Sequence, residues 1–445
     1  MRIVYRDSMH IHFIGIGGIG VSALARYYLS TGAAVSGSDL AASEITTALA
    51  AAGAGIIIGT HSPMNLSPET TQVIYTAATP KTNPELKEAR RRKLKTLSYA
   101  EAVGDLTRRY RAVTVSGAHG KSTTTAMTAL VMEQGYLDPT VIIGTKMREF
   151  GDSNFRRGMG SHLVLEADEW NRSFLNYSPA IAVVTNIDAE HLDTYKTVDA
   201  VEAAFSEYLA KVPADGAIVA NADDPRASAV AKKFGKKVSW FSLKDREAAV
   251  VKPLLKVPGS HNVSNALAAL TAGRVLGVAE PDILQALGRF RGTWRRFELK
   301  GMYRGAHLVS DYGHHPREIA ATLAAARERF PLRRVWCVYQ PHQYQRLKYL
   351  WDDFVSAFDL ADRVCLLPVY DVAGRETATA KKAVNSLRLT EALHKRGKTA
   401  WHSPSFIEAK QFLDGELRRG DVLLVMGAGD IYDLTNELAK SMIRV

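Results

Sequence analysis

Short apolar runs alternate along the chain with glycine-containing turns and longer amphipathic stretches. Runs such as IHFIGI, RAVTVSG and DVLLVMGAG have few polar positions, which is typical of strands buried on both faces of a parallel sheet. The stretches that follow them have the apolar spacing of helices that pack on one side. This alternation predicts an α/β fold built from strand–helix units.

The chain of 445 residues is too long for one ordinary core, and the pattern divides it into blocks. We expect a Rossmann-like domain at residues 1–107, a central P-loop-type ATPase domain at 108–294 and a C-terminal Rossmann-like domain at 295–445. The predicted strands are IHFIGI, AAVSGSD, IIIG and VIYTAA in the first block, RAVTVSG, HLVLEADE, AIAVVTNID and AIVANAD in the second, and HLVSDYG, RVWCVYQ, RVCLLPVY and DVLLVMGAG in the third.

The first block opens with a glycine-rich turn between its first strand and its first helix. Small residues there let the backbone approach a diphosphate, and the helix N-terminus offers unpaired N–H groups. An acidic residue ends the next strand, at a spacing that suits a ribose hydroxyl. The pattern predicts a dinucleotide or a nucleotide-sugar, without choosing between them. Its residues are Gly15, Gly17, Gly18, Ile19, Gly20 and the acidic Asp39.

A second glycine-rich turn opens the central block, again between a strand and a helix. It is shorter than the usual phosphate-binding loop, because its first glycine lies only three residues before Gly120. A lysine at such a turn can neutralise the β- and γ-phosphates of a nucleotide, and a hydroxyl can ligate Mg²⁺. We therefore predict that ATP binds at Gly117, Ala118, His119, Gly120, Lys121, Ser122 and Thr123.

Carboxylates and a histidine follow two later strands of the central block. EADE covers residues 166–169, and TNIDAEHLD covers residues 185–193. The carboxyl ends of parallel strands open on the edge of the sheet that carries the phosphate loop. These side chains are therefore candidates to hold Mg²⁺ against a triphosphate.

Polar clusters also follow two strands of the third block. DYGHHP contains Asp311, His314 and His315, and QPHQYQR contains His342 and Arg346. A lone histidine usually has a structural role, but two adjacent histidines between an acid and a proline favour a site. An arginine such as Arg346 can bind a carboxylate through two parallel hydrogen bonds.

Composition changes this picture little. The net charge of +11 suits anionic substrates, but a solvated basic surface explains it as simply, and aromatic residues are not interleaved with the basic ones as in RNA-binding proteins. We expect no nucleic-acid partner and no membrane insertion, because no apolar run has the length of a span. The N-terminus lacks a signal-peptide pattern, and both cysteines lie in apolar runs. We expect a cytoplasmic monomer or homodimer with reduced thiols.

A series of strings, in this order, resembles the Mur ligase family over nearly the whole chain. The strings are HFIGIGGIGVSALA, GAHGKSTTT, EADE, TNIDAEHLDTY, VPGSHNVSNALAA, RRFELKG, DYGHHPREI, YQPHQYQR and GAGDI. The resemblance implies a ligase that joins L-alanine to the carboxylate of UDP-N-acetylmuramate in peptidoglycan precursor synthesis, using ATP and Mg²⁺. ATP would phosphorylate the carboxylate, and the amine would then attack the acyl phosphate. His191, His314 and His342 stay open as the base that accepts the proton of the amine.

The same resemblance implies roles for individual residues. The first domain would hold the UDP-sugar, with residues 17–20 at the diphosphate and Asp39 near the uridine. The second domain would bind ATP, with Lys121 at the β- and γ-phosphates, and the third would receive the amino acid. The remaining implied contacts are Ser122, Glu166 and His191 to Mg²⁺, His261 and Asn265 to adenine, Arg295 or Arg296 to the triphosphate, Asp311 to the nucleotide, and His314, His315, His342 and Arg346 to the amino acid.

The chain departs from the family pattern in several places. Ala118 and Ser122 stand where threonines are usual, and Gln343 stands where many alanine-adding members have arginine. The small β-region usual after Trp240 is trimmed, and the paired arginines that often precede the phosphate loop are absent from KTLSYAEAVGDL.

Three alternative functions remain open at this point. One is a recycling ligase that adds a peptide to UDP-N-acetylmuramate. Another is a nicotinamide-dependent dehydrogenase, which the first glycine-rich turn suggests but which leaves GAHGKS unexplained. The third is a non-catalytic nucleotide-binding regulator on the same scaffold, against which the intact phosphate-loop lysine and the predicted metal ligands argue.

Overall fold

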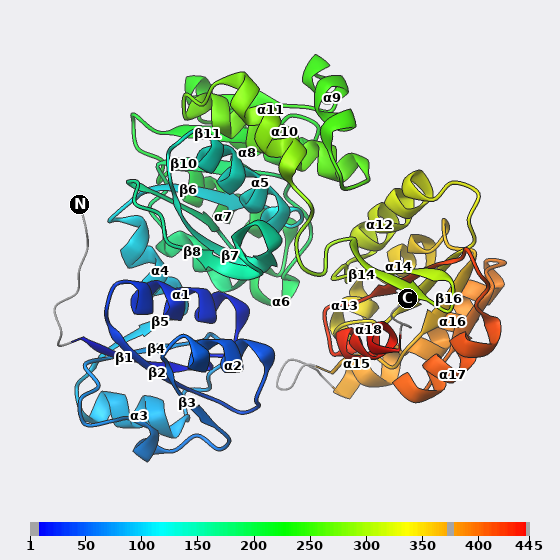
Figure 1. Ribbon diagram of the computed structural model, residues 1–445, viewed down its shortest axis with the longest axis horizontal. Coiled ribbons are helices and arrows are strands. Elements are labelled where there is room, and N and C mark those ends of the chain that lie inside the picture. The colour runs from blue at the N-terminus through cyan, green and yellow to red at the C-terminus, as the bar shows by residue number, and fades with distance from the viewer. Residues whose placement is uncertain (1–8, 372–377, 442–445) are drawn as a thin grey trace. The chain divides into compact units, whose positions relative to one another are not determined.

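The computed structural model describes residues 9–371 and 378–441 (Figure 1). The first eight residues, on which the signal-peptide prediction partly rests, lie outside the described part. Contacts divide the chain into two compact units, which are described separately. One comprises the chain up to Lys256 together with Val263–Arg291, and the other comprises Val257–Asn262 and the chain from Gly292 onward.

The first sheet is wholly parallel and has the strand order β3-β2-β1-β4-β5. β2 and β3 lie on one side of β1, and β4 and β5 lie on the other side. The loop after β1 therefore lies where the strand order reverses, which is the position at which such sheets bind ligands. Polar side chains set where its helices begin: Asn83 caps α3, and Ser98 and Glu101 form a capping box at α4. The elements are β1 (His10–Ile14), α1 (Ile19–Ser30), β2 (Ala34–Asp39), α2 (Glu44–Ala51), β3 (Gly55–Ile58), η1 (Pro63–Asn65), β4 (Gln72–Tyr75), α3 (Pro84–Arg91), β5 (Lys95–Ser98) and α4 (Tyr99–Thr107).

The second sheet belongs to the same unit and has the order β12-β11-β10-β6-β9-β7-β8. Only the edge pair of β7 and β8 is antiparallel. The elements are β6 (Arg111–Ser116), α5 (Lys121–Gln134), β7 (Thr140–Met147), η2 (Arg148–Phe150), β8 (Ser153–Arg156), β9 (His162–Glu166), η3 (Trp170–Asn176), β10 (Ile181–Val184), α6 (Leu192–Tyr195), α7 (Val198–Leu209), β11 (Ala217–Asn221), α8 (Pro225–Lys232), η4 (Gly235–Lys237), β12 (Val238–Phe241), α9 (Arg246–Val251), η5 (Lys252–Leu254), α10 (Ser260–Val275) and α11 (Glu280–Arg289).

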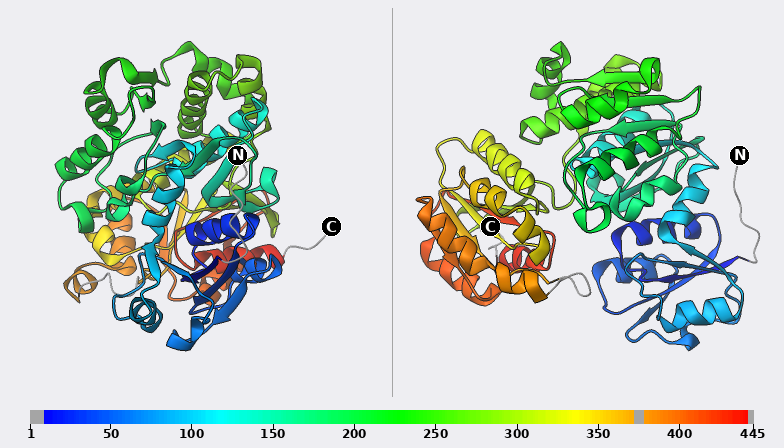
Figure 2. Two further views of the ribbon diagram at one scale, coloured as in Figure 1. Left: turned by 90° about the vertical axis from the view of Figure 1, so that its left-hand side faces the viewer. Right: turned by 180° about the vertical axis from the view of Figure 1, so that it is seen from behind.

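The third sheet lies in the second unit and has the order β13-β14-β18-β15-β16-β17, parallel except for the pair of β13 and β14. Alternate residues of β15 enter different cores: Cys337 and Tyr339 pack with α12 and α14, whereas Trp336 and Val338 pack with α17 and α18. The sheet is therefore covered on both faces, as the apolar strands require (Figure 2). The elements are β13 (Glu298–Tyr303), β14 (Ala306–Asp311), α12 (Pro316–Arg329), β15 (Val335–Tyr339), α13 (Tyr344–Tyr349), α14 (Trp351–Ala357), β16 (Arg363–Leu366), α15 (Ala378–Ala383), α16 (Ser386–Lys395), β17 (Ala400–His402), α17 (Phe406–Glu416), β18 (Val422–Met426) and α18 (Ile431–Lys440).

The predicted α/β class is confirmed, and each apolar run that was predicted as a strand forms one. The sequence pattern missed β5, β7, β8, β12, β13 and β17, which are edge strands or, like β7, pair with an edge strand in a hairpin. Between β12 and α10 the chain has only the short helices α9 and η5. None of the described helices combines the length and the apolar character needed to cross a membrane.

A buried carboxylate ties α3 to the first sheet. Glu85 has no exposed surface and accepts hydrogen bonds from His12 (3.2 Å), Ser38 (2.6 Å), His61 (2.9 Å) and Asn65 (2.6 Å). Burial acts to raise the pKa of this carboxyl group, but the hydrogen bonds outweigh it and lower the pKa to about 2.

We expect Glu85 to contribute to stability in a defined pH range. Because its pKa is lower in the folded protein than the ordinary value of 4.5, the contribution is complete above pH 4.5 and is lost as the pH falls toward 2. A shift of this size corresponds to about 3 kcal/mol. In urea unfolding at pH 7, Glu85→Gln should have a free energy of unfolding lower than that of the unchanged protein by this amount. Between pH 4.5 and 3, the free energy of unfolding should fall less in Glu85→Gln than in the unchanged protein. Equal pH dependence in the two proteins would contradict the expectation.

Candidate active site

The predicted phosphate loop joins β6 to α5 in the second sheet. Gly117 has φ 136° and Gly120 has φ 82°, values that L side chains rarely adopt. Gly120 is the N-cap of α5, and no side chain caps this helix. An uncapped helix N-terminus behind a glycine turn is an anion-binding arrangement. The loop therefore has the backbone shape that a nucleotide phosphate needs.

Residues after β10 and on α10 hold this loop in place. Thr185 donates to the carbonyl of His119 (2.7 Å), and the side chain of Asn186 accepts from His119 N (2.9 Å) and donates to His119 O (3.0 Å). Asn265 accepts from Thr124 at 3.2 Å, and its Oδ1 would lie 2.4 Å from a methyl group on Gly120. The loop has no room for side chains at its glycines.

We expect Gly117→Ala to weaken ATP binding by about tenfold to a hundredfold. The added methyl group would lie 2.1 Å from Thr185 Oγ1, and the backbone has φ 136°, so the loop must move. Strain of this kind costs about 1–3 kcal/mol. Titration with ATP measures the effect. Gly53→Ala is a matched control, because Gly53 also has positive φ but no atom near the added methyl group. Equal ATP affinity in Gly117→Ala and in the unchanged protein would contradict the expectation.

Lys121 lies between the phosphate loop and a buried carboxylate. Its Nζ donates to Gly117 O (2.6 Å) and to both oxygens of Glu169 (3.1 and 3.0 Å). Burial acts to lower the pKa of Lys121, but the charges of Glu169, Asp168 and Glu166 outweigh it and raise the pKa. The ammonium is therefore charged at neutral pH and is held beside the turn that would receive phosphates.

A possible cation site adjoins this lysine. Ligand atoms of Asp168, Glu169 and His191 lie within 4.8 Å of one another, and His191 Nε2 is 3.7 Å from Glu169 Oε1. His191 has φ 56°, a strained conformation of the kind found at functional sites. Carboxylate oxygens suit Mg²⁺ or Mn²⁺, and an imidazole is a common ligand of divalent transition metals. The donor set therefore fits a divalent cation.

The other two predicted metal ligands are placed differently. Glu166, at the end of β9, accepts a hydrogen bond from Gly144 N at 2.6 Å. Ser122 lies in the first turn of α5, and its hydroxyl has no hydrogen bond to any residue in the described part of the chain. Thr123 follows it and is buried. Glu169 belongs to the EADE string, whose carboxylates were candidates for Mg²⁺, but the family resemblance did not name it as a ligand.

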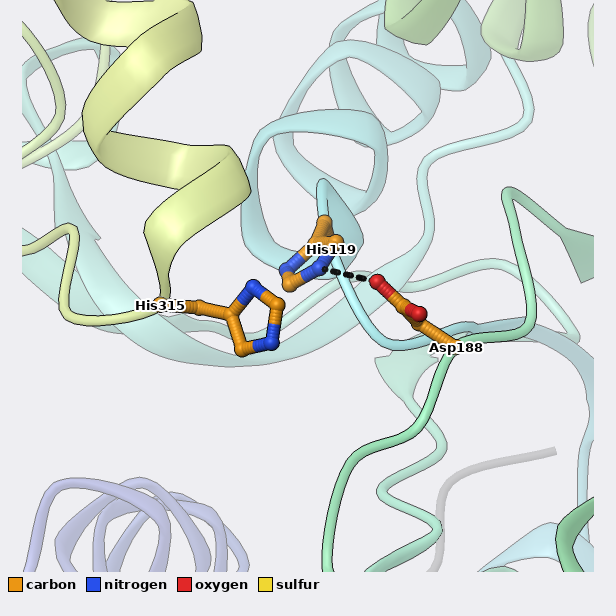
Figure 3. A group of neighbouring side chains, drawn as sticks. All are labelled: His119, Asp188 and His315. Atoms are coloured by element: carbon orange, nitrogen blue, oxygen red, sulfur yellow. Dashed lines mark hydrogen bonds and ion pairs between the residues drawn. The ribbon is translucent and has the colours of Figure 1, made fainter. Parts of the chain in front are cut away.

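His119 of the phosphate loop pairs with an acid that follows β10. Its Nε2 lies 3.3 Å from Asp188 Oδ2, as the dashed line in Figure 3 marks. Thr185, Asn186 and Asp188 all belong to the TNIDAEHLD string. This one segment therefore contacts both the backbone and the side chain of His119. The third residue labelled in the figure, His315, belongs to the second unit. There it is the N-cap of α12, where its Nδ1 accepts a hydrogen bond from Arg317 N (3.3 Å).

The glycine-rich turn of the first sheet is shaped by contacts at each predicted residue. Gly15 has φ 79°, and the amide of Gly17 donates to Asp39 Oδ2 at 2.8 Å. Gly18 is the N-cap of α1 without a side-chain cap, as Gly120 is for α5. The carbonyl of Ile19, in the first turn of α1, accepts from Asn154 of β8 at 2.6 Å. Asp39 thus contacts the turn itself through one carboxylate oxygen.

In the second unit, three predicted residues lie together after β14 and β15. The rings of His314 and His342 are 5.8 Å apart, and His342 stacks on Tyr370 at 5.3 Å. Arg346 Nη1 lies 3.4 Å from His342 Nδ1. The arginine is therefore placed beside the two histidines, where it could hold the carboxylate of a small amino acid.

Gln343 lies between these residues, at the N-cap of α13, with φ 72°. Its amide donates to Tyr370 O at 3.1 Å. Its side chain makes no hydrogen bond to the described residues.

The two adjacent arginines after the RGTW segment have distinct environments. Arg295 is buried and donates to Gly427 O at 2.6 Å, whereas Arg296 is partly exposed and pairs with Glu318 at 3.3 Å. Asp311 accepts from the backbone amides of Phe297 and Gly313, and burial raises its pKa. These contacts show that Asp311 holds the backbone at Phe297 and at Gly313 in position.

His261 and Asn265 lie four residues apart on α10. Burial, with the charge of Arg296, lowers the pKa of His261 to about 4, so its imidazole is neutral near pH 7. Asn265 contacts the phosphate loop, as described above.

Models of three Mur ligase domains match the chain in sequence order. They are the Mur ligase family catalytic domain at residues 10–111, the Mur ligase middle domain at 115–253 and the Mur ligase glutamate ligase domain at 295–429. The chain belongs to the Mur ligase family. This finding also confirms the three-domain architecture that the family resemblance implied.

Similar Mur ligases span nearly the whole chain. UDP-N-acetylmuramate–L-alanine ligase from Clostridium novyi is 39% identical and the alignment covers 96% of each chain. The enzyme of the same name from Acetivibrio thermocellus is 40% identical, with 97% of this chain and 96% of that one covered. The solved UDP-N-acetylmuramate–alanine ligase from Thermotoga maritima has a TM-score of 0.81 and 30% identity, with 97% and 98% covered. A murein peptide ligase from Psychrobacter arcticus shares the Mur ligase fold at 21% identity (TM-score 0.71; 98% and 100% covered).

Proposed function

We propose that this protein joins L-alanine to the carboxylate of UDP-N-acetylmuramate, with hydrolysis of ATP to ADP and phosphate, in peptidoglycan precursor synthesis. The observation that carries the proposal is the near full-length similarity to ligases of that name, in a chain whose phosphate loop holds a charged lysine. Because ATP and UDP-sugars are cytoplasmic, we also place the reaction in the cytoplasm.

Each domain would have one substrate in this proposal. Residues 1–107 would hold the UDP-sugar, with Gly15, Gly17, Gly18, Ile19 and Gly20 near its diphosphate. Residues 108–294 would hold ATP, and residues 295–445 would hold the amino acid, with Arg346 at its carboxylate. The uncapped N-termini of α1 and α5 support the first two assignments.

A carboxylate is a poor electrophile, so the reaction needs an activated intermediate. A carboxylate oxygen of the muramate attacks the γ-phosphorus, the bond to the β,γ-bridging oxygen breaks, and ADP leaves. The amine then attacks the acyl carbon, the tetrahedral intermediate collapses, and phosphate carries away the C–O bonding pair. Lys121 offsets negative charge on the transferring phosphoryl group, because its ammonium lies at the loop and is charged.

Mg²⁺ fits beside this lysine. His191 and the neighbouring carboxylates of Asp168 and Glu169 would hold it, with Ser122 and Glu166 as the further ligands that the family resemblance implies. When bound, the ion neutralises charge on the β- and γ-phosphates.

The attacking amine must lose a proton before or during attack. The ring of His314 lies 5.8 Å from that of His342, and Arg346 lies beside His342, so either histidine could take this proton from an amino acid bound at Arg346. We therefore propose that one of this pair is the base.

Phosphate release with purified full-length protein tests the function. The assay contains ATP, Mg²⁺ and UDP-N-acetylmuramate, to which L-alanine, glycine, L-serine or a tripeptide is added separately. Release that requires the UDP-sugar and is greatest with L-alanine supports the proposal. Release only with the tripeptide identifies a recycling ligase, and release with another amino acid directs attention to Gln343. Binding of ATP without any release would favour the regulator.

A further inference from the structure

The phenol of Tyr99 lies against the glycine-rich turn of the first sheet. Tyr99 is the first residue of α4, far in the sequence from residues 15–20. A methyl group on Gly20 would lie 2.9 Å from Tyr99 Oη and 3.0 Å from Cζ. Glycine at this position of the turn leaves the space that the tyrosine ring occupies. The hydroxyl reaches the first turn of α1, where the diphosphate of a UDP-sugar is proposed to bind.

The position of α4 also brings Tyr99 into the field of the carboxylates after β9. α4 packs closely against η3. A methyl group on Gly104 of α4 would lie only 2.4 Å from the carbonyl oxygen of Asn176 in η3. Burial, together with the charges of Glu166 and Asp168, raises the pKa of Tyr99. The phenol is therefore protonated near neutral pH, and it can donate a hydrogen bond to an anion.

The hydroxyl of Tyr99 differs from those of the neighbouring tyrosines. Tyr27 and Tyr110 share a hydrogen bond at 3.3 Å, and Tyr195 donates to Glu169 O at 2.5 Å. Tyr99 Oη has no hydrogen bond to any residue within 9–371 or 378–441. This phenol belongs to a partly buried side chain beside an uncapped helix N-terminus, so its hydroxyl is available to a ligand.

We propose that Tyr99 contacts the substrate, donating a hydrogen bond from Oη to the diphosphate of the UDP-sugar bound at residues 15–20. The inference rests on the proposed function for the identity of the ligand. In this arrangement the diphosphate would accept hydrogen bonds from the backbone amides of the turn on one side and from Tyr99 of α4 on the other. The side chain has this position because Gly20 leaves room for it.

Calorimetric titration of the full-length protein with UDP-N-acetylmuramate and with UDP-N-acetylglucosamine tests the proposal. Tyr99→Phe removes the hydroxyl and keeps the ring. A hydrogen bond to a charged group predicts about tenfold weaker binding of both ligands. The KM for UDP-N-acetylmuramate should rise similarly, while the KM for ATP stays unchanged. Tyr110→Phe is the matched control: it also loses a hydroxyl next to the same core, but this hydroxyl bonds Tyr27.

Each outcome separates the inference from the function on which it rests. No binding of UDP-N-acetylmuramate by the unchanged protein would overturn the proposed function and the Tyr99 assignment with it. Equal binding by the unchanged protein and by Tyr99→Phe would overturn the assignment alone. A loss confined to UDP-N-acetylmuramate would also overturn it, because that sugar differs by its lactyl carboxylate and both ligands carry the diphosphate.

Discussion

Lys121→Ala should lower phosphate release by about a thousandfold. The ammonium is the charge that lies at the phosphate loop, 2.6 Å from Gly117 O, and loss of one such group from a phosphoryl-transfer site typically has an effect of this size. The measurement is the phosphate-release rate with saturating UDP-N-acetylmuramate and L-alanine. Lys95→Ala is the control, because Lys95 pairs with Asp105 on the surface and should leave the rate unchanged.

The same substitution should also destabilise the protein, and a second variant separates the two effects. Without Lys121, the carboxylate of Glu169 stays buried next to His191 without its main partner, which costs about 3 kcal/mol. Adding Glu169→Gln removes that charge and should restore most of the stability, while the rate stays low because Lys121 is absent and because Glu169 would also hold Mg²⁺. Recovery of the rate in the double variant would show that Lys121 acts only by supporting the fold.

Arg295→Lys should lower the free energy of unfolding by about 3 kcal/mol. The guanidinium of Arg295 is 7% exposed and donates to the carbonyls of Gly427 (2.6 Å) and Gly429 (3.3 Å). Its Cζ lies 4.9 Å from the ring centroid of Tyr312 and 4.7 Å from that of Tyr432. A lysine cannot reproduce the planar group that both bonds these carbonyls and stacks between the rings. Urea unfolding measures the loss.

Arg296→Lys is the matched control for this prediction. Arg296 is the next residue along the chain, but its side chain is 30% exposed, pairs with Glu318, and lies over the Tyr312 ring at 5.1 Å without the carbonyl contacts of Arg295. We expect less than about 1 kcal/mol of destabilisation there. Equal losses in the two variants would contradict a special role for Arg295.

The parts of the fold that follow from burial could be predicted from sequence. The central strand β15 is apolar throughout, and β6 is buried at every position after Arg111, because both faces of a parallel sheet are covered. The β7–β8 hairpin could not be found in the same way. It is an edge element whose turn passes through Gly151 and Asp152, both with positive φ, and its strands contain lysine, threonine and arginine.

The candidate site divides along a similar line. Glycines and the lysine at a strand–helix turn identify the phosphate loop without coordinates. The partner of Lys121 does not follow from EADE, because the first glutamate ends β9 and bonds Gly144, while Glu169 turns back to the lysine from the loop. Tyr99 looks like an ordinary helix residue in the sequence. Only the packing of α4 places it beside Gly20.

With the UDP-sugar bound as proposed, the hydrogen bond between Asp39 and the amide of Gly17 would couple recognition of the nucleoside to recognition of the diphosphate. Oδ2 of the carboxylate holds the turn in shape at 2.8 Å, and Oδ1, which accepts one long hydrogen bond from Ala41 N at 3.5 Å, would be the oxygen that a ribose hydroxyl contacts. The nucleoside and the diphosphate would then both bind to the glycine-rich turn that Asp39 holds in shape. Their binding free energies would be coupled rather than additive. A uridine without phosphates would still favour the shape of the turn that receives them, so fragments of the substrate should bind with positive cooperativity.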